Sequence, residues 1–157
     1  MSQACAIYAR YSTDRQSPAS IDDQVRKCRE YAAAHDFHVS DVHVYCDEAM
    51  SGVGSDRPAL MRMVNAALSV ARPIAAVIVD DTSRLSRSTE DTLSLFRRLT
   101  FAGVQLVAVS QAIDNSNEQA DTLLTIHGLV DSLYVKELAK KTHRGLEGKH
   151  LRGLHAG

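Results

Sequence analysis

The sequence predicts an α/β protein with a mostly parallel sheet of four to five strands, helices on both faces of that sheet, and a long C-terminal helix for pairing subunits. Three observations predict this fold. Short β-prone apolar runs alternate with amphipathic stretches of helical length, which is the pattern of βαβ units. Polar segments follow the apolar runs. Finally, from about Ala120 the chain keeps helical periodicity and contains no proline.

Strand and helix patterns alternate over the first part of the chain. We expect strands at residues 4–9, 38–46, 74–79 and 104–109, and helices at 20–35, from Pro58 onward and at 89–101. The first helix has apolar residues at helical spacing, namely Ile21, Val25, Cys28 and Ala32. Pro58 suits the first position of a helix, and Gly103 suits the end of one.

The long C-terminal helix carries a wide apolar stripe. The stripe comprises Leu123, Ile126, Val130, Leu133 and Tyr134, widened by Leu124, Leu129 and Leu138. A stripe this wide favours packing against a partner chain, and packing onto its own sheet is the alternative. We therefore expect an α/β domain at 1–118, the helix at 119–152, and the start of a linker at 153–157.

Composition narrows the class of protein. A length of 157 residues predicts one domain, and 45% apolar with 24% charged residues excludes the disordered and collagen-like classes. No apolar run approaches the roughly 18 residues that a bilayer span needs, and no signal-peptide pattern opens the chain. The three cysteines match no zinc spacing, so we expect small buried side chains in a reducing cytoplasm, with no metal and no membrane contact.

The net charge of −1 hides an asymmetry. From Lys136 onward six basic residues outnumber two acidic ones, whereas the first 135 residues hold twelve basic and seventeen acidic residues. The basic residues of the C-terminal part are Lys136, Lys140, Lys141, Arg144, Lys149 and Arg152. Such a split indicates either an interaction site or a solvated helix end.

Three polar loops, at 10–14, 47–57 and 80–87, follow predicted strands. Because the carboxyl ends of parallel strands meet at one edge of a sheet, we expect these loops to lie together. They would gather a hydroxyl group and four guanidinium groups, from Arg10, Arg57, Arg84 and Arg87. Arginine suits bidentate recognition of phosphate. The pattern therefore indicates a phosphate site, and solvated arginines paired with neighbouring acids are the alternative.

The sequence does not support three other kinds of site: a Ser-His-Asp triad, a glycine-rich nucleotide loop and a metal site. None of the seven histidines falls in these loops, so a Ser-His-Asp triad has no base. No glycine-rich nucleotide loop follows a strand. Adjacent carboxylates on an extended chain point to opposite faces, so Asp80 and Asp81 are expected to cap the strand end and not to bind a metal.

Four motifs, taken in order, resemble those of the serine recombinases, the family of resolvases, invertases and large serine integrases. They are YARYSTDRQ at 8–16, SIDDQ at 20–24, SG at 51–52 with SDRP at 55–58, and SRLSR at 83–87. The match runs over almost the whole chain, and the RGLEG at 144–148 is most like the large-integrase branch.

The resemblance implies a site-specific DNA recombinase that works without a cofactor. Ser12 would attack a DNA phosphodiester to give a 5′-phosphoserine and a free 3′-hydroxyl, followed by strand exchange and religation in integration, excision or resolution. Arg10, Arg84 and Arg87 would surround the scissile phosphate and Arg57 would lie in a mobile loop. Gln24 and Ser51 would position the serine loop. Many resolvases have Asp where this chain has Ser83, and Asp80 or Asp81 could supply that carboxylate.

The resemblance also implies double-stranded DNA and further copies of the chain as partners. The long helix would form homodimers or homotetramers and would cross the minor groove at its basic end. Contacts to DNA would come from Lys136, Lys140, Lys141, Arg144, Lys149 and Arg152. We expect target recognition to reside in a segment outside this chain, and the protein to act on bacterial or phage DNA in the nucleoid. A small-molecule phosphotransferase or phosphatase, and a non-catalytic oligomerisation module, are the alternatives.

Overall fold

The structure is a computed structural model that describes residues 1–11, 18–48 and 56–151. Its centre is a five-stranded sheet in the order β2-β1-β3-β4-β5. The strands are β1 (Gln3–Arg10), β2 (Phe37–Asp47), β3 (Ala76–Val79), β4 (Gln105–Ala108) and β5 (Ile113–Asp114). The first four run parallel, and β5 pairs antiparallel with β4. This arrangement confirms the predicted mostly parallel sheet.

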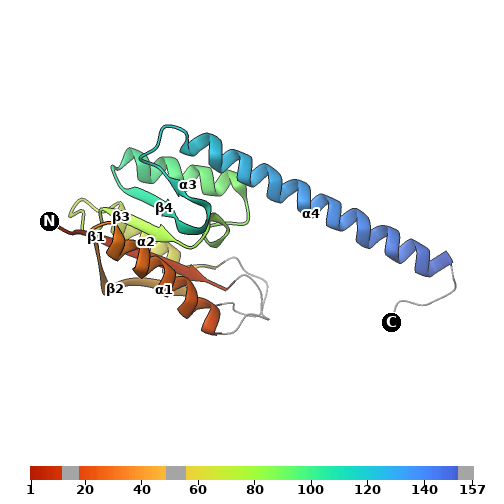
Figure 1. Ribbon diagram of the computed structural model, residues 1–157, viewed down its shortest axis with the longest axis horizontal. Helices are drawn as coiled ribbons and strands as arrows, with labels where there is room; N and C mark the ends of the chain where they lie inside the picture. The colour runs from red at the N-terminus through yellow and green to blue at the C-terminus, as the bar shows by residue number, and fades with distance from the viewer. Residues whose placement is uncertain (12–17, 49–55, 152–157) are drawn as a thin grey trace.

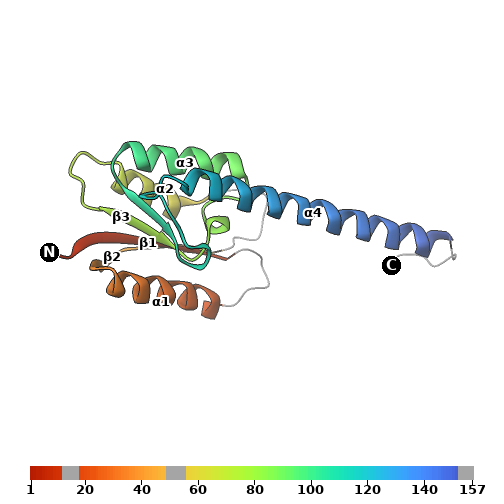
Figure 2. The same ribbon diagram turned by 45° about the horizontal axis from the view of Figure 1, so that its top comes forward.

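Helices cover both faces of the sheet, as Figure 2 shows. The helix α1 (Pro18–Ala34) lies on one face, and α2 (Pro58–Ala67) and α3 (Thr89–Phe101) lie on the other. Alternation along β1 supplies both cores, because successive strand side chains point to opposite faces. Ile7 packs with Cys28 of α1, whereas Tyr8 packs in the larger core with Met63 of α2 and Leu99 of α3.

The parallel strands end together at one edge of the sheet. Arg10 at the end of β1 is in register with Asp47 at the end of β2, and Tyr8 is in register with Val79, the last residue of β3. The strand ends that precede the three predicted polar loops therefore lie at the same edge of the sheet. Parallel pairing is sufficient for this result, because parallel strands have their carboxyl ends at the same edge.

The long helix α4 (Ala120–Leu151) begins on the domain and then projects away from it, as seen in Figure 1. Its first turns pack on α3 and β5, where Ala120 and Leu124 are buried. Leu123 is partly buried against the same core. The other six members of the apolar stripe are more than half exposed, namely Ile126, Leu129, Val130, Leu133, Tyr134 and Leu138. Among the described residues, no helix is long and apolar enough to cross a membrane.

Several local details differ from the sequence-based expectations. The strand expected to reach residue 109 ends at Ala108, because a 3-10 helix, η2 (Val109–Gln111), turns the chain into β5. The polar loop expected at 80–87 contains a second 3-10 helix, η1 (Thr82–Arg84). Cys46 is exposed, so the expectation that every cysteine is buried is wrong there, because β2 is an edge strand. Gly103 has a φ of +74° and ends α3 as predicted.

Candidate active site at the carboxyl edge of the sheet

The edge where β1, β2 and β3 end brings together most of the predicted site residues that the structure describes. Arg10 ends β1, Gln24 lies on α1, Arg57 precedes α2, and Arg84 ends η1. Arg87 follows on the same segment and is exposed. Ser12 and Ser51 lie outside the described residues.

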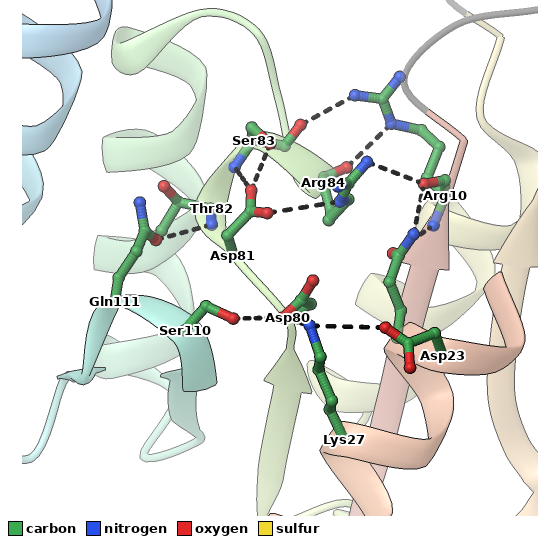
Figure 3. A network of polar contacts seen from close by, with 11 residues as sticks. Arg10, Asp23, Lys27, Asp80, Asp81, Thr82, Ser83, Arg84, Ser110 and Gln111 are labelled. Carbon is green, nitrogen blue, oxygen red and sulfur yellow. Dashed lines mark hydrogen bonds and ion pairs between the residues drawn. The ribbon is translucent and has the colours of Figure 1, made fainter. Parts of the chain in front are cut away.

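The side chains of Arg10 and Arg84 each donate a hydrogen bond to the main-chain carbonyl of the other residue (Figure 3). Arg10 donates from Nε to the carbonyl of Arg84 at 3.1 Å and from Nη2 to the carbonyl of Ser83 at 2.8 Å. Arg84 in turn donates from Nη1 to the carbonyl of Arg10 at 3.2 Å. These contacts join β1 to η1 across more than seventy residues. Carbonyl oxygens carry no net charge, so these hydrogen bonds leave the positive charge of Arg10 in place. Arg84 also lies beside a carboxylate, with its Nε 3.5 Å from Oδ2 of Asp81.

Gln24 of α1 fixes the backbone of Arg10 through two hydrogen bonds. Its Oε1 accepts from the Arg10 amide at 3.2 Å, and its Nε2 donates to the Arg10 carbonyl at 3.1 Å. Gln24 is only 3% exposed, so both ends of its amide need these partners. The residue therefore fixes the end of β1, two positions before Ser12 in the sequence.

Arg57 completes the group of described arginines near this edge. Its Nη1 donates to the carbonyl of Leu85, directly after η1. Burial lowers the pKa of Arg10, and the positive charge of Arg57 lowers it further, with smaller contributions from Arg87 and Arg84. The side chains of Arg57, Arg87 and Arg84 thus add positive charge around Arg10. An anion placed among them would relieve the repulsion.

Asp81 caps the turn after β3, as the sequence predicts, whereas the carboxylate of Asp80 contacts two side chains instead. Asp80 accepts a hydrogen bond from Ser110 and lies 3.8 Å from Nζ of Lys27. Asp81 is the N-cap of η1 and accepts from the amide of Ser83 at 2.9 Å. Within the described ranges, no group of three His, Cys, Asp or Glu side chains could hold a metal ion.

Tyr8 and Asp47 support the site but were missed by the sequence analysis. Tyr8 donates from its hydroxyl to Oδ2 of Asp47 at 2.9 Å. Asp47 also accepts from the amides of Ala59 and Leu60, at 2.9 Å and 3.0 Å, and so caps α2 from the end of β2. Arg57 stands directly before that helix. The sequence does show that Asp47 directly follows a predicted strand, as Asp80 does.

A groove of about 970 Å³ runs from this edge along the base of α4. Asp81, Ser83 and Arg87 line one side, and Tyr134 and Lys136 of α4 line the other. The helix approaches closely here: a Cβ on Gly128 would lie 2.4 Å from side-chain atoms of Thr89. Glycine thus allows α4 to pack against the start of α3. The groove therefore has Arg87 of the sheet edge and Lys136 of α4 in its lining.

The predicted DNA-contacting residues lie away from the sheet edge along α4. Lys136, Lys140, Lys141 and Arg144 are exposed. Lys141 pairs with Glu137 at 3.7 Å, and both side chains are about 70% exposed, so the pair adds little stability. The side chain of Lys149 and the whole of Arg152 lie outside the described part of the chain.

Comparison with known proteins gives one consistent family. The family model for the resolvase N-terminal domain matches residues 5–155. A protein of Bacillus subtilis (strain 168) named "Putative DNA recombinase" is 30% identical over 151 residues; the match covers 95% of this chain and 29% of that protein. A resolvase of Clostridium perfringens is 27% identical over 153 residues, covering 96% of this chain and 74% of that protein.

Solved structures agree with this result. The N-terminal catalytic domain of TP901-1 integrase is 33% identical to the chain, with a TM-score of 0.66, and the match covers 87% of this chain and 99% of that one. A resolvase family site-specific recombinase of Streptococcus pneumoniae has a TM-score of 0.68 at 24% identity, covering 94% and 98% of the two chains, and shows the same fold.

Proposed function

Because this chain belongs to the resolvase family of serine recombinases and has that family's N-terminal catalytic domain, we propose that it cleaves and rejoins DNA in site-specific recombination. The Ser12 oxygen attacks the phosphorus of a phosphodiester and loses its proton, and the bond to the 3′ oxygen breaks. The 3′ oxygen takes up a proton and leaves as a hydroxyl group. The resulting 5′-phosphoserine keeps the ester bond, so religation needs no nucleotide cofactor.

The observation that supports this proposal is the convergence of arginines at the carboxyl edge of the sheet. Nε and Nη2 of Arg10 donate to main-chain carbonyls, which are uncharged. The positive charge of Arg10 is therefore available to an anion. Arg84 and Arg57 come to the same edge from other elements. Phosphoryl transfer spreads negative charge over the nonbridging oxygens, and preorganised cationic donors stabilise that charge. Arg87 is the fourth member of this proposed set, and Gln24 and Ser51 position the serine loop.

The helix α4 supports the proposal for the partners. Its stripe of exposed apolar side chains suits a second copy of the chain, and pairing through it would give homodimers or homotetramers. DNA phosphates would be contacted by the basic residues Lys136, Lys140, Lys141, Arg144, Lys149 and Arg152. Each contact would make the slope of log K against log salt concentration more negative by about 0.9. Such contacts carry no sequence information, so target choice would lie in another segment. The protein would act in the cytoplasm, where bacterial or phage DNA is accessible.

The decisive experiment replaces Ser12 with alanine. The substrate is a duplex from the boundary of the DNA element that encodes the protein, with bridging 3′ sulfur atoms at the candidate cleavage positions so that cleavage cannot reverse. We expect the wild-type protein to form a covalent adduct that survives denaturant, and Ser12→Ala to form none while melting at the same temperature. Ser40→Ala, on the distant half of β2, is the matched control and should form the adduct. An adduct in Ser12→Ala would refute the proposal.

A further inference from the structure

The two acids that follow β3 have different surroundings, although they are neighbours in the sequence (Figure 3). Asp80 is 7% exposed and is engaged by Ser110 and Lys27, on the side of η2 and α1. Asp81 points to η1 instead. Its Oδ1 accepts from the Ser83 amide at 2.9 Å and from the Ser83 hydroxyl, and its Oδ2 lies 3.5 Å from Nε of Arg84.

The contact between Asp81 and Arg84 is partly shielded from solvent. The side chain of Arg84 is 13% exposed and that of Asp81 is 24% exposed. Two nitrogens of Arg84 have an oxygen close by: Nη1 donates a hydrogen bond to the Arg10 carbonyl, and Nε lies in ion-pair distance of Oδ2 of Asp81 without forming a hydrogen bond. Because a guanidinium is planar, contacts at two of its nitrogens determine how the plane is turned.

Ser83 links this ion pair to Arg10. Its amide and hydroxyl both donate to Asp81, while its carbonyl accepts from Nη2 of Arg10 at 2.8 Å. One carboxylate oxygen of Asp81 thus holds the backbone that Arg10 binds, and the other lies beside Arg84. The same acid therefore acts on two arginines of the proposed phosphate site.

We propose that Asp81 is a positioning residue for the Arg84 guanidinium in DNA cleavage. The inference rests on the proposed function, because it assumes that Arg84 stabilises the transition state. Asp81 touches neither the phosphate nor Ser12 in this proposal; it fixes the direction in which Arg84 presents its charge. Asp80 has no such role, since its carboxylate is turned to Ser110 and Lys27.

The test is a double-mutant cycle with Asp81→Asn and Arg84→Ala, measured as single-turnover cleavage of the sulfur-containing duplex by the full-length protein. Asparagine can still accept from the Ser83 amide, so the turn is retained while the negative charge is lost. Loss of a preorganised donor typically costs about 10²–10³ in rate, and we expect loss of its orientation to cost about tenfold. In the Arg84→Ala background, Asp81→Asn should have no further effect, because residues that act as a unit are not additive.

Two controls distinguish a positioning role of Asp81 from a general loss of structure in the Asp81→Asn variant. The dissociation constant for DNA and the melting temperature should stay unchanged in Asp81→Asn, and Asp91→Asn, an exposed acid that contacts Ser86, should cleave at the wild-type rate. If asparagine impairs folding, Asp81→Ser is a second neutral cap. An unchanged rate in the neutral variant, or additive effects of the two substitutions, would overturn the inference alone. Absence of a Ser12-dependent adduct in the wild-type protein would overturn both proposals.

Discussion

The hydrogen bond between Tyr8 and Asp47 offers a direct measure of how the fold holds α2 and Arg57 in place. Both residues are buried, with Tyr8 at 0% and Asp47 at 7% exposure, so solvent screening is small. Tyr8→Phe removes one donor to a charged acceptor, which costs about 1.5–3 kcal/mol. Asp47→Ala also removes the cap of α2, worth about 0.5–2 kcal/mol, and leaves the Tyr8 hydroxyl without this acceptor, at about 1–3 kcal/mol. We expect the free energy of unfolding to fall by about 2 kcal/mol in Tyr8→Phe and by about 3 kcal/mol in Asp47→Ala.

The assay is urea unfolding of the wild-type protein and the two variants, with melting temperature as a second readout. For a chain of this size each kcal/mol shifts the melting temperature by about 2–4 °C, so Tyr8→Phe should melt roughly 4–8 °C lower. Loss of the α2 cap should also slow cleavage in Asp47→Ala, because Arg57 stands directly before Pro58 at the start of that helix.

The same pair predicts a dependence on alkaline pH. Burial raises the pKa of Tyr8 above its ordinary value of 10.0, and the negative charge of Asp47 raises it further. A group whose folded pKa is raised contributes stability that is complete below pH 10.0 and declines as the pH rises through the folded value. Tyr8→Phe should therefore lose less stability than the wild-type protein above pH 10.0. A loss under about 0.5 kcal/mol at neutral pH, with an unchanged alkaline profile, would refute this account of the contact.

Two further predictions concern the proposed phosphate site and the long helix. Arg84→Ala and Arg87→Ala should each reduce single-turnover cleavage by about 10²–10³ without changing the oligomeric state measured by analytical ultracentrifugation, and normal cleavage would contradict the electrostatic role. Leu133→Glu should shift the protein toward monomer at unchanged secondary structure by circular dichroism, because Leu133 is 56% exposed and lies in the apolar stripe of α4. An oligomer that is insensitive to this change would show that the stripe is not the subunit interface.

Local sequence patterns were sufficient for the order and type of the main elements. The helix expected at 89–101 is α3 (Thr89–Phe101), with Ser88 accepting from the Asp91 amide at its start and Gly103 following its end. Such signals act within a few residues, so they can be recognised in the sequence. The predicted meeting of Arg10 and Arg84 at one edge follows from parallel strands alone. The short strand β5 had no comparable signal, because two residues are too few to show a period.

The partners of the site residues were decided by tertiary structure. The carbonyls that accept hydrogen bonds from Arg10 belong to Ser83 and Arg84, and no spacing in the sequence shows which groups of that segment Arg10 contacts. Asp47 caps a helix that begins eleven residues later only because β2 and α2 pack together. Likewise, both acids after β3 were equal candidates in the sequence, and the turn of η1 directs Asp81 alone to Arg84. Periodicity encodes which face of an element is buried, whereas a hydrogen bond between distant residues depends on strand register and packing, which arise only when the whole chain folds.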